Sequence, residues 1–293
     1  MVIVVRLIGG LGNQMFQYAT GRAVAEHHRA LLLLDISGFE SYNLRRYELD
    51  CFDIDARPAR ADELTGFSHI SRKQTIVNRI LNKIGVFASA SRLREASFAY
   101  DHRIETLTLP VYLDGYWQSE KYFAQLAPVL RREFTLKDSL DKANREMMHK
   151  IERAGARAVS LHVRRGDYVS NPHTAQHHGV CTLDYYRSAV ERISRQIANP
   201  HFFVFSDDPA WVQANLEVPH ATTLVQVNDA DHGMFDLALM KTCGHHIIAN
   251  SSFSWWGAWL NPSPEKIVIA PQRWFRESTS DTRDLLPSAW IRL

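Results

Sequence analysis

Residues 2–35 read VIVVRLIGGLGNQMFQYATGRAVAEHHRALLLLD. Val2–Arg6 is a β-branched, apolar run typical of a buried strand, and Gly9–Gly12 is a glycine-rich turn. Apolar residues then recur at helical spacing over residues 15–24, and Ala30–Leu34 is a second short apolar run. Strand, turn, helix and strand in this order predict a βαβ unit and the start of a parallel sheet.

A second set of apolar runs begins near residue 157. Five of them predict strands, at 158–163, 202–205, 223–227, 246–249 and 266–269. Helical or loop segments separate these runs, and this alternation is typical of a doubly wound α/β domain.

Between the two sets, residues 111–114 predict a strand and Ser119 can cap a helix that continues to about Arg132. A polar helix is expected over 139–153. Residues 56–105 show no secure pattern. A domain boundary between about residues 135 and 155 therefore fits.

The length of 293 residues suits two domains of about 150 residues each. We expect an α/β fold with two Rossmann-like domains, residues 1–150 and 151–293, that face a shared cleft. Clefts between domains commonly hold ligands, so the functional site is expected there.

Composition excludes several classes of protein. Lys plus Arg (34) nearly balance Asp plus Glu (32), and a net charge of +2 disfavours a general nucleic-acid binder. The three cysteines, Cys51, Cys181 and Cys243, lack C-x-x-C spacing and are expected to be reduced. The apolar N-terminal run is too short for a signal peptide, and no stretch approaches the roughly 18 apolar residues of a membrane span. We expect a cytoplasmic protein with, at most, peripheral membrane contact.

The first glycine turn allows three interpretations. Gly10-x-Gly12 after a strand, with Asp35 after the next strand, matches part of a dinucleotide fingerprint and favours an NAD-dependent oxidoreductase. Met15 occupies the position where that fingerprint has a third small residue. Alternatively, the turn is only structural, with Asn13 as the helix N-cap. In the third interpretation, bare N–H groups and the Asn13 amide contact sugar or phosphate oxygens.

An arginine motif follows the strand predicted at 158–163. Since alternate residues of a strand share a face, His162 and Arg164 should point one way and Arg165 the other. Arg164 can bind two diphosphate oxygens and stabilise the charge that develops as a sugar–phosphate bond breaks. For Arg165, a structural ion pair with Asp167 is an equal alternative.

A serine and tryptophan segment lies near the end of the chain. Ser251, Ser252 and Phe253 occupy a turn at the start of a predicted helix, where N–H groups and the helix dipole favour an anion such as pyrophosphate. Three tryptophans of this helix, Trp255, Trp256 and Trp259, are expected in the core.

Carboxylates suggest a base-binding group and, less strongly, a metal. Asp236 lies on a helix predicted over 229–243 and can accept from guanine N1–H and N2–H. Asp229-x-Asp231 and the pair 207–208 have spacings compatible with a divalent cation, but such pairs are common by chance. No metal is expected.

Three segments, Gly9–Ala19, His162–Asp167 and Ser251–Leu260, together resemble the α-1,2-fucosyltransferase family, in its bacterial form. The arginine motif is also similar to that of α-1,6- and protein O-fucosyltransferases, so a GDP-fucose donor is better supported than the linkage. The resemblance implies a GT-B fold with a donor-binding C-terminal domain and an N-terminal domain on the acceptor side. It implies fucosyl transfer to the 2-hydroxyl of a terminal β-galactoside.

The resemblance also implies roles for individual residues. His162 and Asp236 would contact guanine, Arg164 would contact the β-phosphate, and Arg165 belongs to the same donor-binding motif. The diphosphate would be held by three residues of the serine turn, Ser251, Ser252 and Phe253. The donor would be GDP-L-fucose, and no cofactor is implied.

The implied reaction inverts the anomeric centre. The acceptor hydroxyl attacks opposite the departing GDP, and a base, for which Asp167 is the candidate, or solvent takes its proton. Asn13 would face the reacting sugar. A dissociative transition state would make leaving-group stabilisation by Arg164 more important than a strong base.

Acceptor choice is left open by the sequence. The loop 168–181, with His173, His177 and His178, is a candidate for it. The expected acceptor is a galactose-containing oligosaccharide or lipid-linked glycan of a bacterial surface. A non-catalytic glycan-binding module, suggested by the seven tryptophans, remains an alternative to an enzyme.

Overall fold

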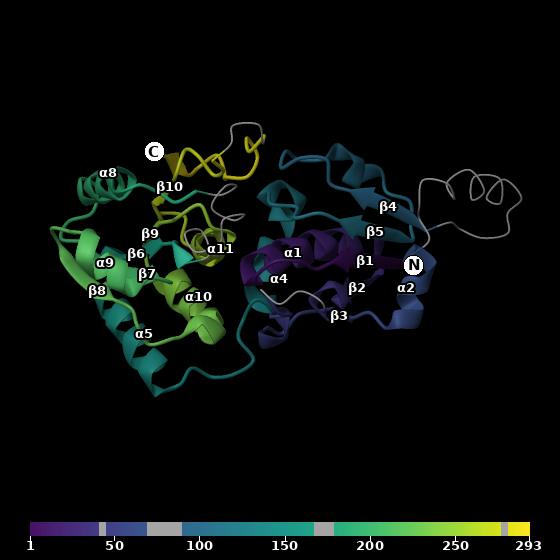
Figure 1. Ribbon diagram of the computed structural model, residues 1–293, viewed down its shortest axis with the longest axis horizontal. Coiled ribbons are helices and arrows are strands. Elements are labelled where there is room, and N and C mark those ends of the chain that lie inside the picture. The colour runs from purple at the N-terminus through teal and green to yellow at the C-terminus, as the bar shows by residue number, and fades with distance from the viewer. Residues whose placement is uncertain (41–44, 69–89, 167–178, 277–280) are drawn as a thin grey trace, which may run out of the picture. The chain divides into compact units, whose positions relative to one another are not determined.

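The computed structural model describes residues 1–40, 45–68, 90–166, 179–276 and 281–293. The chain divides into two compact units, Met1–Thr135 with Asp281–Leu285, and Leu136–Ser280 with Leu286–Leu293. Each unit contains its own parallel sheet with helices packed against it (Figure 1). The α/β class and the presence of two Rossmann-like units are therefore confirmed.

The first unit is built on a five-stranded sheet of order β3-β2-β1-β5-β4. Its strands are β1 (Val2–Arg6), β2 (Leu31–Asp35), β3 (Arg57–Pro58), β4 (Ser91–Arg94) and β5 (Val111–Asp114). All four neighbouring pairs are parallel, and β1 lies at the centre, with Val4 opposite both Leu33 and Tyr112. The predicted βαβ unit is confirmed, and β3 and β4 come from the stretch that showed no pattern.

Helix α1 (Leu11–His28) packs against this sheet at very short range. A Cβ on Gly21 would lie 2.3 Å from Val5 Cγ2, so only glycine permits the observed approach of helix to strand. Met15 is fully buried. In a dinucleotide fingerprint, a small residue early in the helix allows close contact with the strand. Here Gly21, six residues after Met15, allows that contact.

The start of α1 corrects one expectation. The N-cap residue is Gly10, with extended backbone and no side-chain cap, and Asn13 lies inside the first turn, where its N–H donates to Gly10 O. Asn13 is therefore not the N-cap. Gly9 has φ +78°, a conformation that favours glycine, and this turn directs the chain into the helix.

Among the described residues, the other α-helices of the first unit are α2 (Ala61–Ser68) and α4 (Ala127–Glu133). Ser119 does act as a cap, since its side chain accepts from Lys121 N, but it caps only a 3-10 turn, Glu120–Tyr122. A continuous helix to Arg132 was expected. Instead, α4 starts anew with Pro128 in its first turn, a position that proline tolerates.

Residues 281–285 return late in the chain to the first unit. Asp284 fixes them there, because its carboxylate accepts from Tyr100 N (2.9 Å) and pairs with Lys121 Nζ (2.6 Å). Its carbonyl also accepts from the Ser119 hydroxyl. The first unit is thus completed by a segment that follows most of the second unit in sequence.

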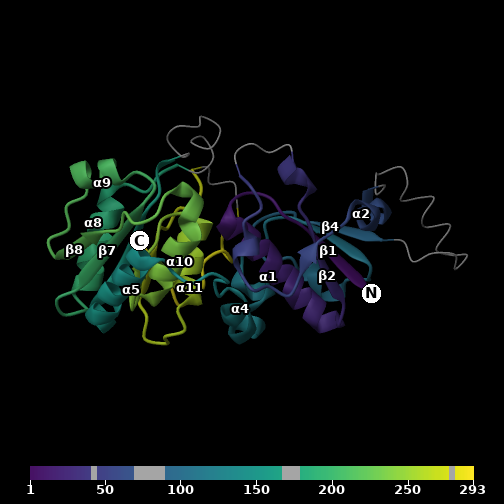
Figure 2. The ribbon, with the colours of Figure 1, turned by 90° about the horizontal axis from the view of Figure 1, so that it is seen from below.

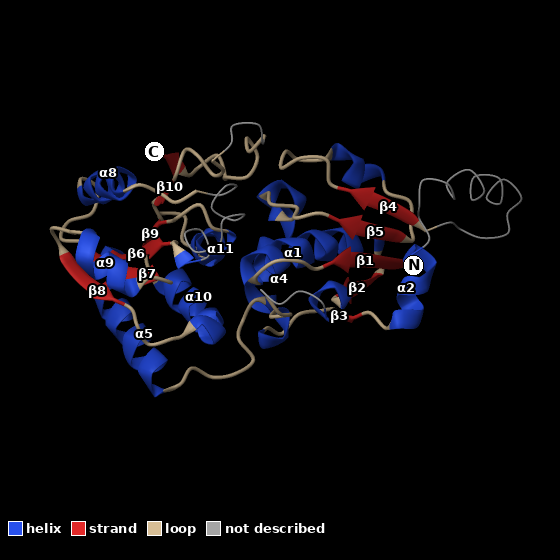
Figure 3. Cartoon of the chain, viewed as in Figure 1, coloured by secondary structure: helices blue, strands red, loops and turns tan. Residues whose placement is uncertain are grey.

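The second unit contains a six-stranded parallel sheet of order β11-β10-β9-β6-β7-β8. Its strands are β6 (Ala158–Val163), β7 (His201–Ser206), β8 (Ala221–Leu224), β9 (His245–Ile247), β10 (Val268–Ala270) and β11 (Ile291–Arg292). The α-helices of its described residues are α5 (Lys142–Ala154), α8 (Leu183–Ser194), α9 (Pro209–Asn215), α10 (Gly233–Thr242) and α11 (Ser252–Leu260). Figure 3 shows this alternation of strands and helices.

Two apolar cores cover opposite faces of this sheet. The helices that contribute to them, such as α8 and α10, are labelled in Figure 2. On one face, Val159, Leu161 and Val163 of β6 pack with α8 and α9. On the other face, Ala158 packs with α5 and α10. The alternation along β6 places Ser160 and His162 on the α5 and α10 face.

The three cysteines are free thiols. Within the described ranges, no helix has the length and apolar character needed to cross a membrane.

Candidate active site

The faces predicted for His162 and Arg165 are confirmed by the rings that these side chains contact. The His162 ring lies 5.9 Å from the Phe253 ring of α11, centroid to centroid. The Arg165 guanidinium lies 4.0 Å above the Trp211 ring of α9. The chain thus sends His162 and Arg165 to different faces of the sheet, as the strand period requires.

Arg164 pairs with Asp207, the first residue after β7. Arg164 Nη1 lies 3.0 Å from Asp207 Oδ2, and both side chains are about one-fifth exposed (21% and 24%). Asp207 Oδ1 also accepts from Arg165 N (2.8 Å). A Cβ on Gly166 would lie 2.4 Å from Asp207 Oδ2, so glycine leaves room for this carboxylate. Asp207 thus orients the arginine at the carboxyl end of the sheet.

Arg165 is built into the fold. Its Nε lies 3.2 Å from Asp208 Oδ2, and its guanidinium stacks on Trp211. Arg165 thus pairs with Asp208 and Trp211, whereas the ion pair expected with Asp167 and a phosphate contact both stay predictions. Asp167 lies outside the described residues, as do His173, His177 and His178.

His162 is a buried, neutral imidazole. Its side chain is 5% exposed, and within the described part of the chain Nδ1 has no hydrogen-bond partner. Burial, with a contribution from the nearby Arg164 charge, lowers the pKa of His162 to about 3. A buried unpaired ring nitrogen is costly unless a ligand or water satisfies it.

The start of α10 meets Phe253 and carries Asp236. A Cβ on Gly233 would lie 3.7 Å from Phe253 Cε2, so α10, α11 and β6 come together around this ring. Asp236 Oδ1 accepts from Asn228 Nδ2 (2.7 Å). Burial raises the pKa of Asp236 to about 6, although the Asn228 hydrogen bond opposes the shift.

The serine turn forms the N-terminus of α11. Ser251 occupies the N-cap position with extended backbone, but its hydroxyl makes no capping bond. Ser252 and Phe253 follow as the first helical residues and are partly buried. The helix N-terminus therefore presents N–H groups and a partial positive charge suited to an anion.

The tryptophans of α11 are core residues, as expected. Trp255 and Trp256 are fully buried, and Trp259 is 4% exposed. The Trp255 ring stacks on Trp259 (6.0 Å) and contacts Trp290 (5.3 Å). Their role is to fix the helix behind the serine turn.

Asn13 belongs to the first unit, whereas the other described candidates belong to the second. Its Oδ1 accepts from Gln118 Nε2 (2.8 Å), a partner that the sequence did not reveal. Asp35 is engaged within the fold, since its carboxylate accepts from Tyr112 Oη (2.5 Å) and Ser37 Oγ (2.6 Å). The acidic residue of the dinucleotide interpretation is thus used structurally.

The carboxylates considered for metal binding have protein partners. Asp207 and Asp208 pair with arginines, and Asp229 accepts from Asp231 N and contacts His232 Nδ1 (2.6 Å). In the ranges that the structure describes, no three His, Cys, Asp or Glu side chains are grouped as metal ligands.

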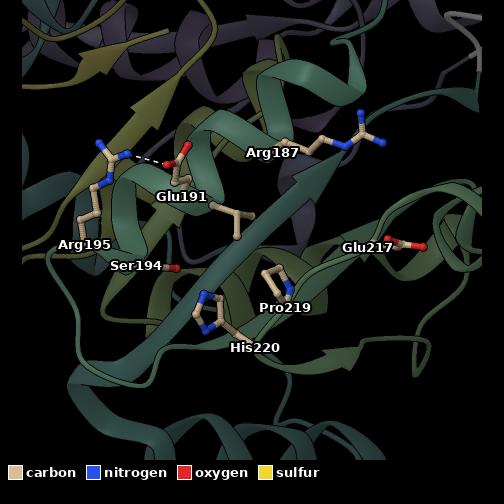
Figure 4. Close-up of a pocket in the computed structure, with 8 residues that line it drawn as sticks. Arg187, Glu191, Ser194, Arg195, Glu217, Pro219 and His220 are labelled. Carbon is tan, nitrogen blue, oxygen red and sulfur yellow. Dashed lines mark hydrogen bonds and ion pairs between the residues drawn. The ribbon is translucent and has the colours of Figure 1, made fainter.

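A separate pocket of about 320 Å³ lies between α8 and the segment that precedes β8 (Figure 4). It is lined by Val190, Ser194, Pro219 and His220, with charged residues at its edges. Arg195 is paired with Glu191. The pocket shares no residue with the predicted site.

Comparison with known proteins identifies the family. Residues 93–293 match the model of glycosyl transferase family 11. The chain belongs to glycosyltransferase family 11. It is 36% identical to an α-1,2-colitosyltransferase of Escherichia coli, over 100% of this chain and 99% of that one. It is 32% identical to the O-antigen biosynthesis glycosyltransferase WbnK of E. coli, over 98% and 99% of the two chains. Mouse galactoside 2-α-L-fucosyltransferase Sec1 is 30% identical over 51% of this chain and 42% of its own length.

Solved structures support the fold of this glycosyltransferase. A mutant of Arabidopsis thaliana FUT1 in complex with GDP superposes with a TM-score of 0.52 at 13% identity, covering 93% of this chain and 71% of that one. Fucosyltransferase NodZ from Bradyrhizobium gives 0.50 at 14% identity, covering 89% and 93%. The GT-B class expected for a chain with two Rossmann-like units is confirmed, and membership of family 11 makes the protein a sugar-transferring enzyme.

Proposed function

We propose that this glycosyltransferase transfers L-fucose from GDP-β-L-fucose to the 2-hydroxyl of a terminal β-galactoside, with inversion to an α-1,2 linkage. The proposal is carried by one arrangement in the second unit. The Arg164 guanidinium, the buried unpaired imidazole of His162 and the start of α11 lie at the carboxyl end of one sheet. In open α/β sheets, this end is where ligands bind.

Each group has a part in binding and activating the donor. His162 and Asp236 contact guanine, and the N-terminus of α11, with Ser251, Ser252 and Phe253, binds the diphosphate. Arg164, held by Asp207, contacts the β-phosphate. A guanidinium carries five N–H donors, so it can pair with a carboxylate and phosphate oxygens together.

In the reaction, a bond forms between the acceptor oxygen and C1 of fucose, and the bond from C1 to the β-phosphate oxygen breaks. Negative charge develops on the departing GDP, and Arg164 stabilises it. The hydroxyl proton passes to Asp167 or to solvent. Asn13 contacts the reacting sugar, and no metal takes part.

The names of relatives support the linkage and the acceptor class. Two of them specify α-1,2 transfer or a galactoside acceptor, and one specifies O-antigen biosynthesis. We infer that the acceptor is a galactose-containing glycan of a bacterial surface polymer, assembled in the cytoplasm or at the inner face of the membrane.

The deciding experiment incubates the protein with GDP-fucose and a panel of β-galactosides and measures released GDP and product linkage. We expect GDP release only with an acceptor and a product linked at O2. Titration with GDP and with NAD runs in parallel. Tight NAD binding without GDP binding or release would replace the proposal with an oxidoreductase, and galactoside binding without transfer would favour a glycan-binding module.

A second donor is suggested by one specific observation, the full-length similarity to an α-1,2-colitosyltransferase. Colitose differs from L-fucose in lacking the 3-hydroxyl. Comparing kcat/KM for GDP-fucose and GDP-colitose with one acceptor separates the two donors. A site that hydrogen-bonds the 3-hydroxyl will reject the deoxy sugar strongly, because its polar partner is left unpaired.

A further inference from the structure

A chain of amide hydrogen bonds connects the N-terminus of α5 to Asp236 on α10. Asp141 caps α5 by accepting from Asn144 N (2.8 Å), and the same Oδ1 accepts from Asn144 Nδ2 (3.1 Å). Asn144 and Asn228 then exchange two hydrogen bonds, at 2.7 and 2.9 Å. Asn228 Nδ2 finally donates to Asp236 Oδ1 at 2.7 Å. We refer to Asn144 and Asn228 as the amide relay.

Asp141, which caps α5, determines the orientation of both side-chain amides of the relay. Asp141 accepts hydrogen bonds at both contacts, so the Asn144 side that faces it must be its NH₂ group. Asn144 Oδ1 is then directed to Asn228, which must donate to it with one N–H. The second N–H of Asn228 points to Asp236. A flipped amide at either asparagine would place two acceptors or two donors together.

Within the amide relay, Asn144 is fully buried and Asn228 is partly buried. The amide hydrogen bonds of Asn144 are satisfied by Asp141 and Asn228. Buried polar groups that are fully paired hold one geometry, because any other arrangement leaves a group unpaired. The relay therefore fixes the carboxylate of Asp236 in one orientation.

The fixed carboxylate keeps acceptor capacity for a ligand. Among the described residues, Asp236 Oδ2 has no hydrogen-bond donor, and Oδ1 uses one of its two lone pairs for Asn228. A carboxylate edge with two free lone pairs matches two adjacent N–H donors. Guanine presents such a pair at N1 and N2, whereas hypoxanthine lacks the N2 donor.

We propose that Asn144 and Asn228 are positioning residues that hold Asp236 for guanine and thereby set the preference for guanine over hypoxanthine. The inference rests on the proposed function, since it requires a GDP-activated donor. Asn228 acts directly on the carboxylate, and Asn144 acts through Asn228. The hydrogen bond from Asn228 also favours the ionised carboxylate, which is the form that accepts both N–H groups.

The test measures the affinities of the full-length protein for GDP and IDP by calorimetry, with wild type, Asn228→Ala and Asn144→Ala. We expect Asn228→Ala to weaken GDP binding about tenfold and to reduce the GDP-to-IDP affinity ratio towards one. Asn144→Ala should act in the same direction with a smaller effect. With GDP-fucose, KM should rise while kcat changes less than about twofold, because the reacting centre is untouched.

A double-mutant cycle shows whether the effect passes through the carboxylate. Asp236→Asn removes the acceptor edge, so adding Asn228→Ala to it should change the GDP-to-IDP ratio no further. Asn215→Ala is the matched control, since Asn215 Nδ2 donates to Trp211 O at 2.9 Å on a different helix. It should leave the ratio unchanged.

The outcomes separate this inference from the proposed function. If the relay variants lower thermal stability or kcat while the GDP-to-IDP ratio keeps its wild-type value, the relay is only structural and the inference fails. If wild-type protein binds neither GDP nor IDP, the proposed function fails first. Both affinities are measured on one sample, so their ratio does not depend on the folded fraction, and Asn228→Ser provides a milder variant.

Discussion

The carboxyl ends of the two parallel sheets are chemically different. In the second unit, the residues that follow β6 and β7 are charged, and they form the pair Arg164–Asp207. In the first unit, β1 and β5 end in the ion pair Arg6–Asp114, and the residues that follow these strands include the amides of Asn13 and Gln118, which bond each other. A charged end suits a diphosphate, and an amide-rich end suits the neutral hydroxyls of a sugar. The contrast is in line with the proposal that the second unit binds the nucleotide and that Asn13 of the first unit contacts the sugar.

Glu95 is a carboxyl group at the amide-rich end of the first sheet, and its burial disfavours its ionised form. Glu95 accepts from Tyr116 N (2.6 Å) and Trp117 N (2.9 Å), and these bonds hold a turn in which Trp117 has φ +57°. Burial raises the pKa of Glu95 to about 7, although the two N–H groups oppose the shift. Even this acidic group therefore carries much less charge than its type implies.

Among the substitutions that test the contrast between the two sheet ends, Arg164→Ala is expected to have the largest effect. Arg164→Ala should lower kcat about 10²–10³-fold, because a donor to the departing phosphate is lost. Arg165→Ala should leave kcat nearly unchanged and lower the free energy of unfolding by about 1–2 kcal/mol, since its partners Asp208 and Trp211 are structural. Steady-state kinetics and denaturant unfolding test both. Equal, mild kinetic effects would remove the distinction between the two arginines.

Glu95 should make stability depend on pH. Its folded pKa of about 7 lies above the ordinary value of 4.5, so the folded protein keeps a proton that the unfolded chain releases between these values. Stability should therefore fall as pH rises from about 4.5 to 7, by about 1–3 kcal/mol from this group. Glu95→Gln should flatten that part of the profile in urea unfolding. An unchanged slope would mean that Glu95 is ionised in the folded protein at these pH values.

Asn13→Ala tests whether the carboxyl end of the first sheet also contributes to nucleotide binding. The change leaves Gln118 Nε2 without its acceptor, so the free energy of unfolding should fall by about 1 kcal/mol. The Kd for GDP, which carries no sugar, should stay within about twofold. Asn13→Asp keeps an acceptor oxygen and serves as the control. A large loss of GDP affinity with Asn13→Ala would show that the amide end also serves the nucleotide.

The smallest effect concerns the pH dependence of donor binding. The raised pKa of Asp236, about 6, means that its carboxylate gains a proton as pH falls through 6 and loses acceptor capacity. The affinity for GDP-fucose should drop about fourfold between pH 7 and 5.5. His162, with a pKa of about 3, stays neutral over this interval. Asp236→Asn should abolish the change, and a pH dependence that survives it would assign the titration to another group.

Continuous apolar strands were predictable from sequence, whereas edge strands and pairings were not. β1 and β6 were placed correctly because every residue between their ends is buried. β8 was expected at 223–227 but spans Ala221–Leu224 at the sheet edge, where partial exposure removes the apolar signal. The strand was predicted too far along the chain because Val225, the residue after β8, is buried and donates its N–H to Val204 O.

The site was predictable to the extent that its chemistry lies in local motifs. The faces of His162 and Arg165 follow from the strand period alone. Asp207 was assigned no part in orienting Arg164, because the two residues are joined only by the pairing of β6 with β7. Asn144 and Asn228 were missed because buried asparagines carry no sequence pattern, and only the packing of α5 against α10 brings them together.

Residues 281–285 complete the first unit although they follow most of the second in sequence. Cutting the gene after residue 135 would therefore yield an N-terminal fragment that keeps Tyr100, Ser119 and Lys121 but lacks their partner Asp284. A chimaera that replaces the second unit with that of a relative needs two crossover points in its C-terminal portion, one on each side of residues 281–285. Recombination between relatives at a single midpoint would exchange Asp284 for a residue selected in another context.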